Sequence, residues 1–304
     1  MVPDVDVPLT WGAQLAHAER MLAERADATA REEALTLLGS LLGEPMTLVQ
    51  ARPSTPMRPP DVATYTGWIA RRLAGEAIPH ITGHLAFMGL DLTVAHDSPL
   101  VSPAAQLLVE VALECARSRV SGTTSGELFG AEIGAGCGAV ALALVTFEPR
   151  FARIFAVDPS PDALRVAAAN GGRYLVNLVV DWREGEGLSA VPEPVDIIVC
   201  DLAAQSARHS SAQNADASGS RASAAPSPLA PLLAQAPAKL RSGGALVCAL
   251  NGGLEAEARE SLAHALPAAH IWTAPSSGGL FVAVAQSPRA LSDQARDVTF
   301  ERGR

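Results

Sequence analysis

The chain has 304 residues, more than the roughly 250 at which a single hydrophobic core stops growing, so we expect two domains. Hydrophobic residues make up 48% of the chain and charged residues 18%, a composition that supports a buried core and excludes global disorder. The formal net charge of −9 argues against a nucleic-acid partner, because binding to phosphates requires a basic surface.

The cysteines and the N-terminus bear on where the protein works. The four cysteines are widely spaced and form neither a C-x-x-C pair nor a cluster with histidines at metal-ligand spacing. We therefore expect reduced thiols and no metal site. Residues 1–8 contain two aspartates and no basic residue, unlike a signal peptide, and no segment has the roughly 20 uncharged apolar residues of a membrane span. These features predict a cytoplasmic protein that does not enter a membrane.

A small helical domain is expected over residues 1–90. Apolar residues recur at helical spacing over 11–22, and Thr10 stands where a side chain can cap the first turn. A second helix is expected over 30–42 and should end at Gly43, because glycine readily adopts the left-handed conformation that follows a helix.

Three further elements are expected before residue 120. The proline-rich segment 53–60 should be a connector, after which Asp61 is placed to cap a helix that runs to about residue 73. Alternating apolar and polar residues predict a strand over 89–94, and a continuous apolar face predicts a helix over 106–117.

Beyond Thr124, short apolar runs alternate with helical patterns, which is typical of βαβ units around a mostly parallel sheet. The expected strands are 128–133, 153–157, 175–180, 195–200, 245–250, 270–273 and 280–285, and the expected helices are 139–146, 162–169, 229–240 and 254–266, with a turn at 242–244. Residues 203–228 hold almost no large apolar side chain, so a disordered insertion is expected there. The sheet domain is thus predicted to span 91–287, followed by a frayed tail over 288–304.

The most informative segment is E-I-G-A-G-C-G at 132–138, which follows an expected strand and opens an expected helix. Glycines allow a sharp turn and let a ligand approach the backbone without a Cβ in the way, while the helix offers free N–H donors. We expect a ribose-bearing or carboxylate-bearing cofactor at this glycine loop, which consists of Gly134, Ala135, Gly136, Cys137 and Gly138. A dinucleotide site or a purely structural turn would have a similar pattern.

Acidic and aromatic residues accompany the next two strands. Asp158 ends the strand after the glycine loop, where a carboxylate can accept both hydroxyls of a ribose; alternatively, Asp158 or Ser160 caps the following helix. Asp181 and Trp182 are expected at the end of the third strand. There Asp181 could accept from an adenine amino group and Trp182 offers a ring face to a purine, although a tryptophan that only covers the core edge would fit as well.

A series of short motifs runs through most of the chain. They are R-R-L-A-G-E at 71–76, I-T-G at 81–83, F-M-G-L at 87–90, L-L-V-E at 107–110, the glycine segment at 132–138, V-D at 157–158, D-W at 181–182 and V-D-I-I at 195–198. In order and approximate spacing this series resembles the HemK/PrmC family of protein-glutamine methyltransferases. The resemblance implies a class I, Rossmann-like methyltransferase fold with a mostly parallel seven-stranded sheet and a small N-terminal helical domain. It also implies S-adenosylmethionine as the cofactor, with the glycine loop near the methionine moiety, Asp158 on the ribose and Trp182 beside the adenine.

The chain departs from the family on the acceptor side. Family members methylate a glutamine amide in peptide chain release factors, and an Asn-Pro-Pro-Tyr motif follows their fourth strand; here residues 201–204 read D-L-A-A. An asparagine amide both donates to and accepts from a glutamine amide, whereas the carboxylate of Asp201 only accepts. Asp201 is a candidate catalytic and cofactor-binding residue, or else a loop cap. The family's Arg-Pro-Glu-Thr-Glu element likewise reads S-P-A-A-Q at 102–106.

Three functions follow as hypotheses. The first is S-adenosylmethionine-dependent methyl transfer to a protein side-chain nitrogen, with a release factor as partner. The second is a catalytically impaired relative that binds the cofactor or a protein without turnover. The third is an NAD(P)-dependent oxidoreductase, which is disfavoured because the sequence offers neither a second cofactor-half repeat nor an evident Tyr-Lys or Ser-Tyr pair for hydride transfer.

Overall fold

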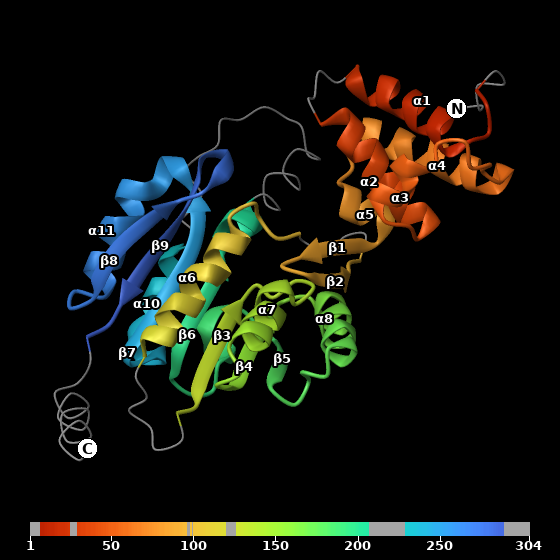
Figure 1. Cartoon of the computed structure of the whole chain (residues 1–304). Coiled ribbons are helices and arrows are strands. Elements are labelled where there is room, and N and C mark those ends of the chain that lie inside the picture. Colours follow the sequence, from red (N-terminus) through yellow and green to blue (C-terminus); the bar gives the residue numbers. More distant parts are fainter. Residues whose placement is uncertain are drawn as a thin grey trace, which may run out of the picture. The chain divides into compact units, whose positions relative to one another are not determined.

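The computed structural model describes residues 7–24, 29–95, 98, 100–119, 126–206 and 229–288. The chain forms two compact units, one of residues 1–85 with 94–97 and the other of residues 86–93 with 98–304 (Figure 1). The predicted insertion therefore lies outside the described residues from 207 to 228, and the predicted tail does so from 289 onward.

The described part of the first unit is helical. Its helices are α1 (Trp11–Ala23), α2 (Ala30–Leu42), α3 (Met46–Ala51), α4 (Pro59–Leu73) and α5 (Ile78–Thr82). As predicted, the Thr10 side chain caps α1 by accepting the Ala13 N–H, and Gly43 ends α2 with a φ of 67°. In the shared core of these helices the buried Tyr65 hydroxyl donates to the Ala34 carbonyl at 2.9 Å.

The start of α4 differs from the prediction. The helix begins at Pro59, because the fixed φ of proline suits a first helical turn, where the N–H is not needed. Asp61 is therefore not the cap but lies within that turn, 2.7 Å from Arg58. The helices α3 and α5 were not predicted, since six and five residues are too few to show helical periodicity.

A two-stranded sheet precedes the large one in the chain. It consists of β1 (His84–Phe87) and β2 (Leu90–Thr93), and the sequence predicted β2 but not β1. Met88 and Gly89 join the strands with φ of 49° and 82°, as expected for a two-residue hairpin turn.

The large sheet has seven strands: β3 (Leu128–Ile133), β4 (Phe151–Asp158), β5 (Val180–Glu184), β6 (Val195–Asp201), β7 (Leu240–Asn251), β8 (His270–Pro275) and β9 (Leu280–Gln286). Their order is β5-β4-β3-β6-β7-β9-β8. β9 pairs antiparallel with both β7 and β8, and the other neighbouring strands of this sheet pair parallel. The predicted fold, a mostly parallel seven-stranded sheet of the class I methyltransferase type with a helical N-terminal region, is confirmed.

Helices cover both faces of this sheet (Figure 1). On one face lie α6 (Ala105–Ser118), α7 (Ala139–Phe147) and α8 (Pro161–Arg173), and on the other lie α10 (Leu229–Lys239) and α11 (Glu255–Ala265). Residues 202–206 are helical as well. Because side chains alternate along a strand, neighbouring residues of one strand face different helices.

Two details of the sheet correct the sequence prediction. The third strand begins at Val180 rather than Leu175, because Leu175 and Leu178 are apolar but stand 88% and 93% exposed in a turn. The turn expected at 242–244 lies inside β7, where Gly243 has a φ of 71° and the pairing register with β6 shifts.

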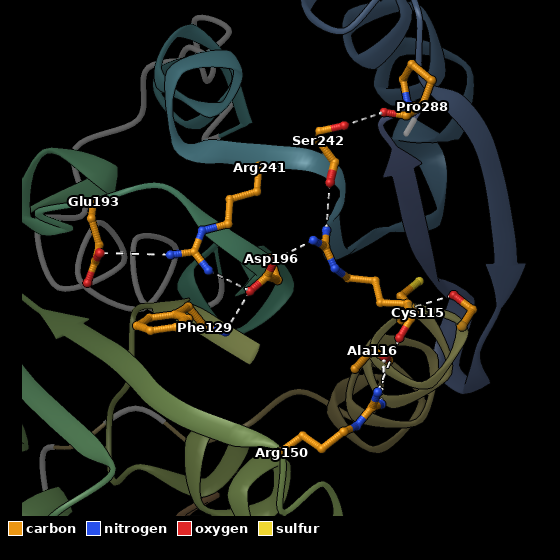
Figure 2. A network of polar contacts seen from close by, with 11 residues as sticks. Cys115, Ala116, Phe129, Arg150, Glu193, Asp196, Arg241, Ser242 and Pro288 are labelled. Carbon is orange, nitrogen blue, oxygen red and sulfur yellow. Dashed lines mark hydrogen bonds and ion pairs between the residues drawn. The ribbon is translucent and has the colours of Figure 1, made fainter. Parts of the chain in front are cut away.

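A polar network ties the amino ends of three strands together (Figure 2). The Asp196 carboxylate, almost completely buried at the start of β6, accepts the Phe129 N–H of β3 at 2.7 Å. It also pairs with Arg119 at 2.7 Å and with Arg241 of β7 at 3.1 Å. Arg241 in turn lies 4.2 Å from the centre of the Phe129 ring. This network stands at the end of the sheet away from the glycine loop.

Candidate functional site

The glycine loop connects β3 to α7 at the carboxyl edge of the sheet. Gly134, Gly136 and Gly138 have φ of 85°, 53° and 84°, in the left-handed region that side chains disfavour. The N–H groups of Gly134 and Ala135 donate to the Val157 carbonyl of β4 at 2.8 and 3.0 Å. Since β3 has β4 on one side and β6 on the other, the loop lies at the point where strand order reverses, the usual ligand site of open α/β sheets.

Asp158 lies against this loop, as the sequence predicted. Its carboxylate is completely buried at the end of β4 and accepts the Gly136 N–H and the Ser160 N–H, each at 2.9 Å. Ser160, not Asp158, caps α8, because its hydroxyl accepts the Ala163 N–H. The two hydrogen bonds leave lone pairs on the carboxylate for further donors.

Trp182 also contacts the glycine loop, although it lies within β5 and not after it. A Cβ on Gly138 would be 2.8 Å from the Trp182 ring, so the loop requires glycine there. The ring is held in place because its Nε1 donates to the Asn177 side chain at 2.9 Å. The structure thus brings the loop, Asp158 and Trp182 together.

Asp181 does not join this group. It is the register partner of Phe155, whose side chain belongs to the core on the α10–α11 face. There the Asp181 carboxylate pairs with Arg183 at 2.9 Å. The alternation of side chains along β5 therefore points Asp181 and Trp182 to different faces of the sheet.

Asp201 ends β6 on the same face as the glycine loop. One carboxylate oxygen accepts the Ser102 N–H at 2.8 Å and the other the Ala204 N–H at 3.1 Å. Asp201 therefore holds the S-P-A-A-Q segment, caps the helical residues 202–206 and still lines a cavity. That cavity has about 20 Å³ and is lined by Leu100, Val101, Glu132, Gly134, Ala135, Gly136, Cys137, Val140, Asp201 and Ala204.

One buried thiol belongs to the glycine loop itself. Cys137 of the glycine loop is a free, buried cysteine, and burial raises its pKa to about 12.

The described residues contain no group of three or more His, Cys, Asp or Glu side chains suited to a metal. Nor does that part of the chain contain a helix long and apolar enough to cross a membrane.

Glu132 is a member of the glycine segment whose role the sequence did not reveal. Its carboxyl group is buried at the end of β3 and accepts the Ala141 N–H of α7 at 2.9 Å. Burial, and secondarily the charges of Asp158 and Asp201, raise the pKa of Glu132 well above its ordinary value. The folded protein therefore favours the neutral carboxyl group at this position.

This raised pKa predicts that Glu132 lowers the free energy of unfolding by an amount that depends on pH. Above the ordinary glutamate pKa the unfolded chain releases the Glu132 proton while the folded chain retains it, so this residue lowers stability as pH rises. We expect Glu132→Gln to gain stability relative to the wild type as pH increases from 5 to 8. Urea unfolding at several pH values measures this difference. The exposed Glu184→Gln is the control, and an equal slope for both variants would contradict the prediction.

Asn170 is a second residue that the sequence analysis missed. Its side chain, fully buried on α8, donates to the Cys137 carbonyl of the glycine loop at 3.0 Å. The same amide donates to the Thr93 carbonyl and accepts the Thr93 N–H, both at 2.9 Å. Asn170 therefore fastens β2 to the loop. The available signal was a polar residue on the otherwise apolar, buried face of the amphipathic helix α8.

Sequence comparison relates the chain to release factor glutamine methyltransferases. Residues 13–83 match the family model described as the PrmC N-terminal domain. The chain is 35% identical over 131 residues to a release factor glutamine methyltransferase of Koribacter versatilis, covering 43% of this chain and 44% of that protein. The protein of the same name from Agrobacterium fabrum is 31% identical over 62% of this chain and 65% of its own length. That from Moorella thermoacetica is 32% identical over 60% and 62%.

Among solved structures, a ribosomal protein L11 methylase from Lactobacillus delbrueckii subsp. bulgaricus is 16% identical, with a TM-score of 0.46 over 65% of this chain and 84% of that chain. The strand order, not this superposition, carries the fold class. The chain spans about half to two thirds of the length of the three curated relatives. The sequence matches confirm the resemblance to the HemK/PrmC family that the ordered motifs indicated.

Proposed function

We propose that this chain is an S-adenosylmethionine-dependent methyltransferase that acts on a side-chain nitrogen of a protein, namely the glutamine amide of a peptide chain release factor. The observation that carries the proposal is the hydrogen bond from the Gly136 N–H to the Asp158 carboxylate at the reversal point of the sheet. This hydrogen bond places the exposed backbone of a glycine next to a carboxylate that is suited to bind a ribose. The names of the curated relatives support the choice of acceptor.

The residues present fit the cofactor by their chemistry. The glycine loop would take the methionine moiety, the remaining lone pairs of Asp158 would accept the ribose hydroxyls, and Trp182 would lie beside the adenine. When bound, the cofactor supplies a methyl group on a positively charged sulfur. Asp181, predicted as a further contact to adenine, faces the other side of the sheet and is left out of the proposed site.

Asp201 would receive the acceptor amide. Its carboxylate lies at the cavity and can accept the N–H of a glutamine amide, which would orient the nitrogen toward the methyl group. Both oxygens are already bonded to backbone N–H groups, so the carboxylate is fixed in direction. The reaction then depends on positioning. The four free, buried cysteines suit a reducing compartment such as the cytoplasm.

Two titrations and one transfer assay test the proposal. Calorimetry should show that S-adenosylmethionine binds while NAD does not, and mass spectrometry should show one methyl group added to a release factor glutamine. Binding of S-adenosylmethionine without transfer would favour the impaired relative that keeps the cofactor. Binding of NAD alone would favour the oxidoreductase, and neither ligand binding would refute the proposed site.

A further inference from the structure

The Gln205 side chain occupies the space that the glycine loop leaves open. Gln205 belongs to the helical residues 202–206, directly after β6. A Cβ on Gly134 would collide with the Gln205 amide nitrogen and lie 3.1 Å from its Cδ. The amide therefore lies over Gly134, the first glycine of the loop. It occupies the space beside the backbone that the missing Cβ leaves open to a ligand.

Two polar contacts hold the Gln205 amide there. Its Nε2 donates to the Ile133 carbonyl at the end of β3 at 3.0 Å and lies 3.4 Å from the Cys200 sulfur. A neutral hydrogen bond of this kind contributes only modestly in net terms, because the same groups bond to water when they separate. The contact is therefore strong enough to hold the side chain and weak enough to be displaced.

The cavity at the glycine loop is too small for the methionine moiety of the cofactor. The cavity bounded by the glycine loop, Asp201 and Ala204 has about 20 Å³, which is room for roughly one water molecule. Pockets for ligands of cofactor size usually measure hundreds of cubic ångströms. Since the Gln205 amide stands over Gly134, an adenosyl cofactor can reach that glycine only after the Gln205 side chain has turned away.

We propose that Gln205 is an internal ligand of the glycine loop that competes with the adenosyl cofactor for the space over Gly134. This inference rests on the proposed function. The protein exists in a closed form, with the amide on the Ile133 carbonyl, and an open form that binds. The apparent dissociation constant is then the intrinsic constant divided by the open fraction.

Removal of the amide should strengthen cofactor binding. We expect Gln205→Ala to bind S-adenosylmethionine and S-adenosylhomocysteine about 10-fold more tightly than the wild type, as loss of one such hydrogen bond from the closed form implies. Stopped-flow tryptophan fluorescence on the full chain should show the gain in the association rate constant, with the dissociation rate constant unchanged. Gln205→Met, which keeps the length but loses the donor, should show a smaller gain of the same kind.

The control is Gln50→Ala, which removes an exposed glutamine from α3 and should bind as the wild type does. Thermal unfolding verifies that each variant is folded. Equal or weaker binding by both Gln205 variants, while the wild type binds, would overturn the internal ligand and leave the proposed function intact. Failure of all variants to bind either adenosyl compound would overturn the proposed function, and this inference with it.

Discussion

Replacing Asp196 with alanine should lower the free energy of unfolding by about 3 kcal/mol, the low end of the range for removing one partner of a buried ion pair. The buried carboxylate holds Arg119 at 2.7 Å and Arg241 at 3.1 Å. Without it, both guanidinium groups and the Phe129 N–H lose their common acceptor at the amino ends of β3, β6 and β7 (Figure 2). Urea denaturation of the wild type and the variant measures the loss.

Glu193→Ala is the matched control for this variant. Glu193 also faces Arg241, but at 3.9 Å and with 45% of its side chain exposed. We expect a loss below about 0.5 kcal/mol, as for other exposed ion pairs. Similar losses for Glu193→Ala and Asp196→Ala would show that burial does not set the strength of this network.

Asp158→Asn should weaken S-adenosylmethionine binding by about 100-fold. The carboxylate accepts two backbone N–H groups, from Gly136 and Ser160, whereas an asparagine turns an NH₂ group toward one of these donors. The loop then loses its anchor, and the ribose loses an ionised acceptor, an interaction that contributes about 1.5–3 kcal/mol. Calorimetric titration on the full chain gives the two dissociation constants.

Asp162→Asn removes a carboxylate four residues further on, where 80% of the side chain is exposed in the first turn of α8. It should bind the cofactor as the wild type does. Should Asp158→Asn also keep its affinity while remaining folded, Asp158 would have no part in the cofactor site.

Local pattern predicted the centre of the sheet well and its margins less well. The strands β3, β4 and β6 are buried on both faces, and their short, continuous apolar runs fit few structures other than a buried strand. The start of β5 was misplaced, because Leu175 and Leu178 resemble strand residues but project from a turn. The backbone at Leu175 has a φ of 58°, and such a conformation in leucine leaves no mark in the sequence.

The candidate site divides in the same way. The sequence predicted the positions of the glycine loop and of Asp158 because a bend, a helix start and a strand end each have a local signature. Asp181 was placed with Trp182, but the face of a strand residue depends on a register that changes with a shift of one position. Asn170 and Gln205 escaped notice because their partners are 33 and 72 residues away along the chain.

The sheet order also determines which strands have an unpaired side. Because β9 pairs with both β7 and β8, the two outermost strands are β5 and β8. β5 has only five residues, and Asp181, Arg183 and Glu184 are charged; β8 ends at Pro275, which has no N–H to offer. Short, charged or proline-ended margins resist the addition of a foreign strand. At both edges of the large sheet, the sequence therefore disfavours pairing with a strand of another copy.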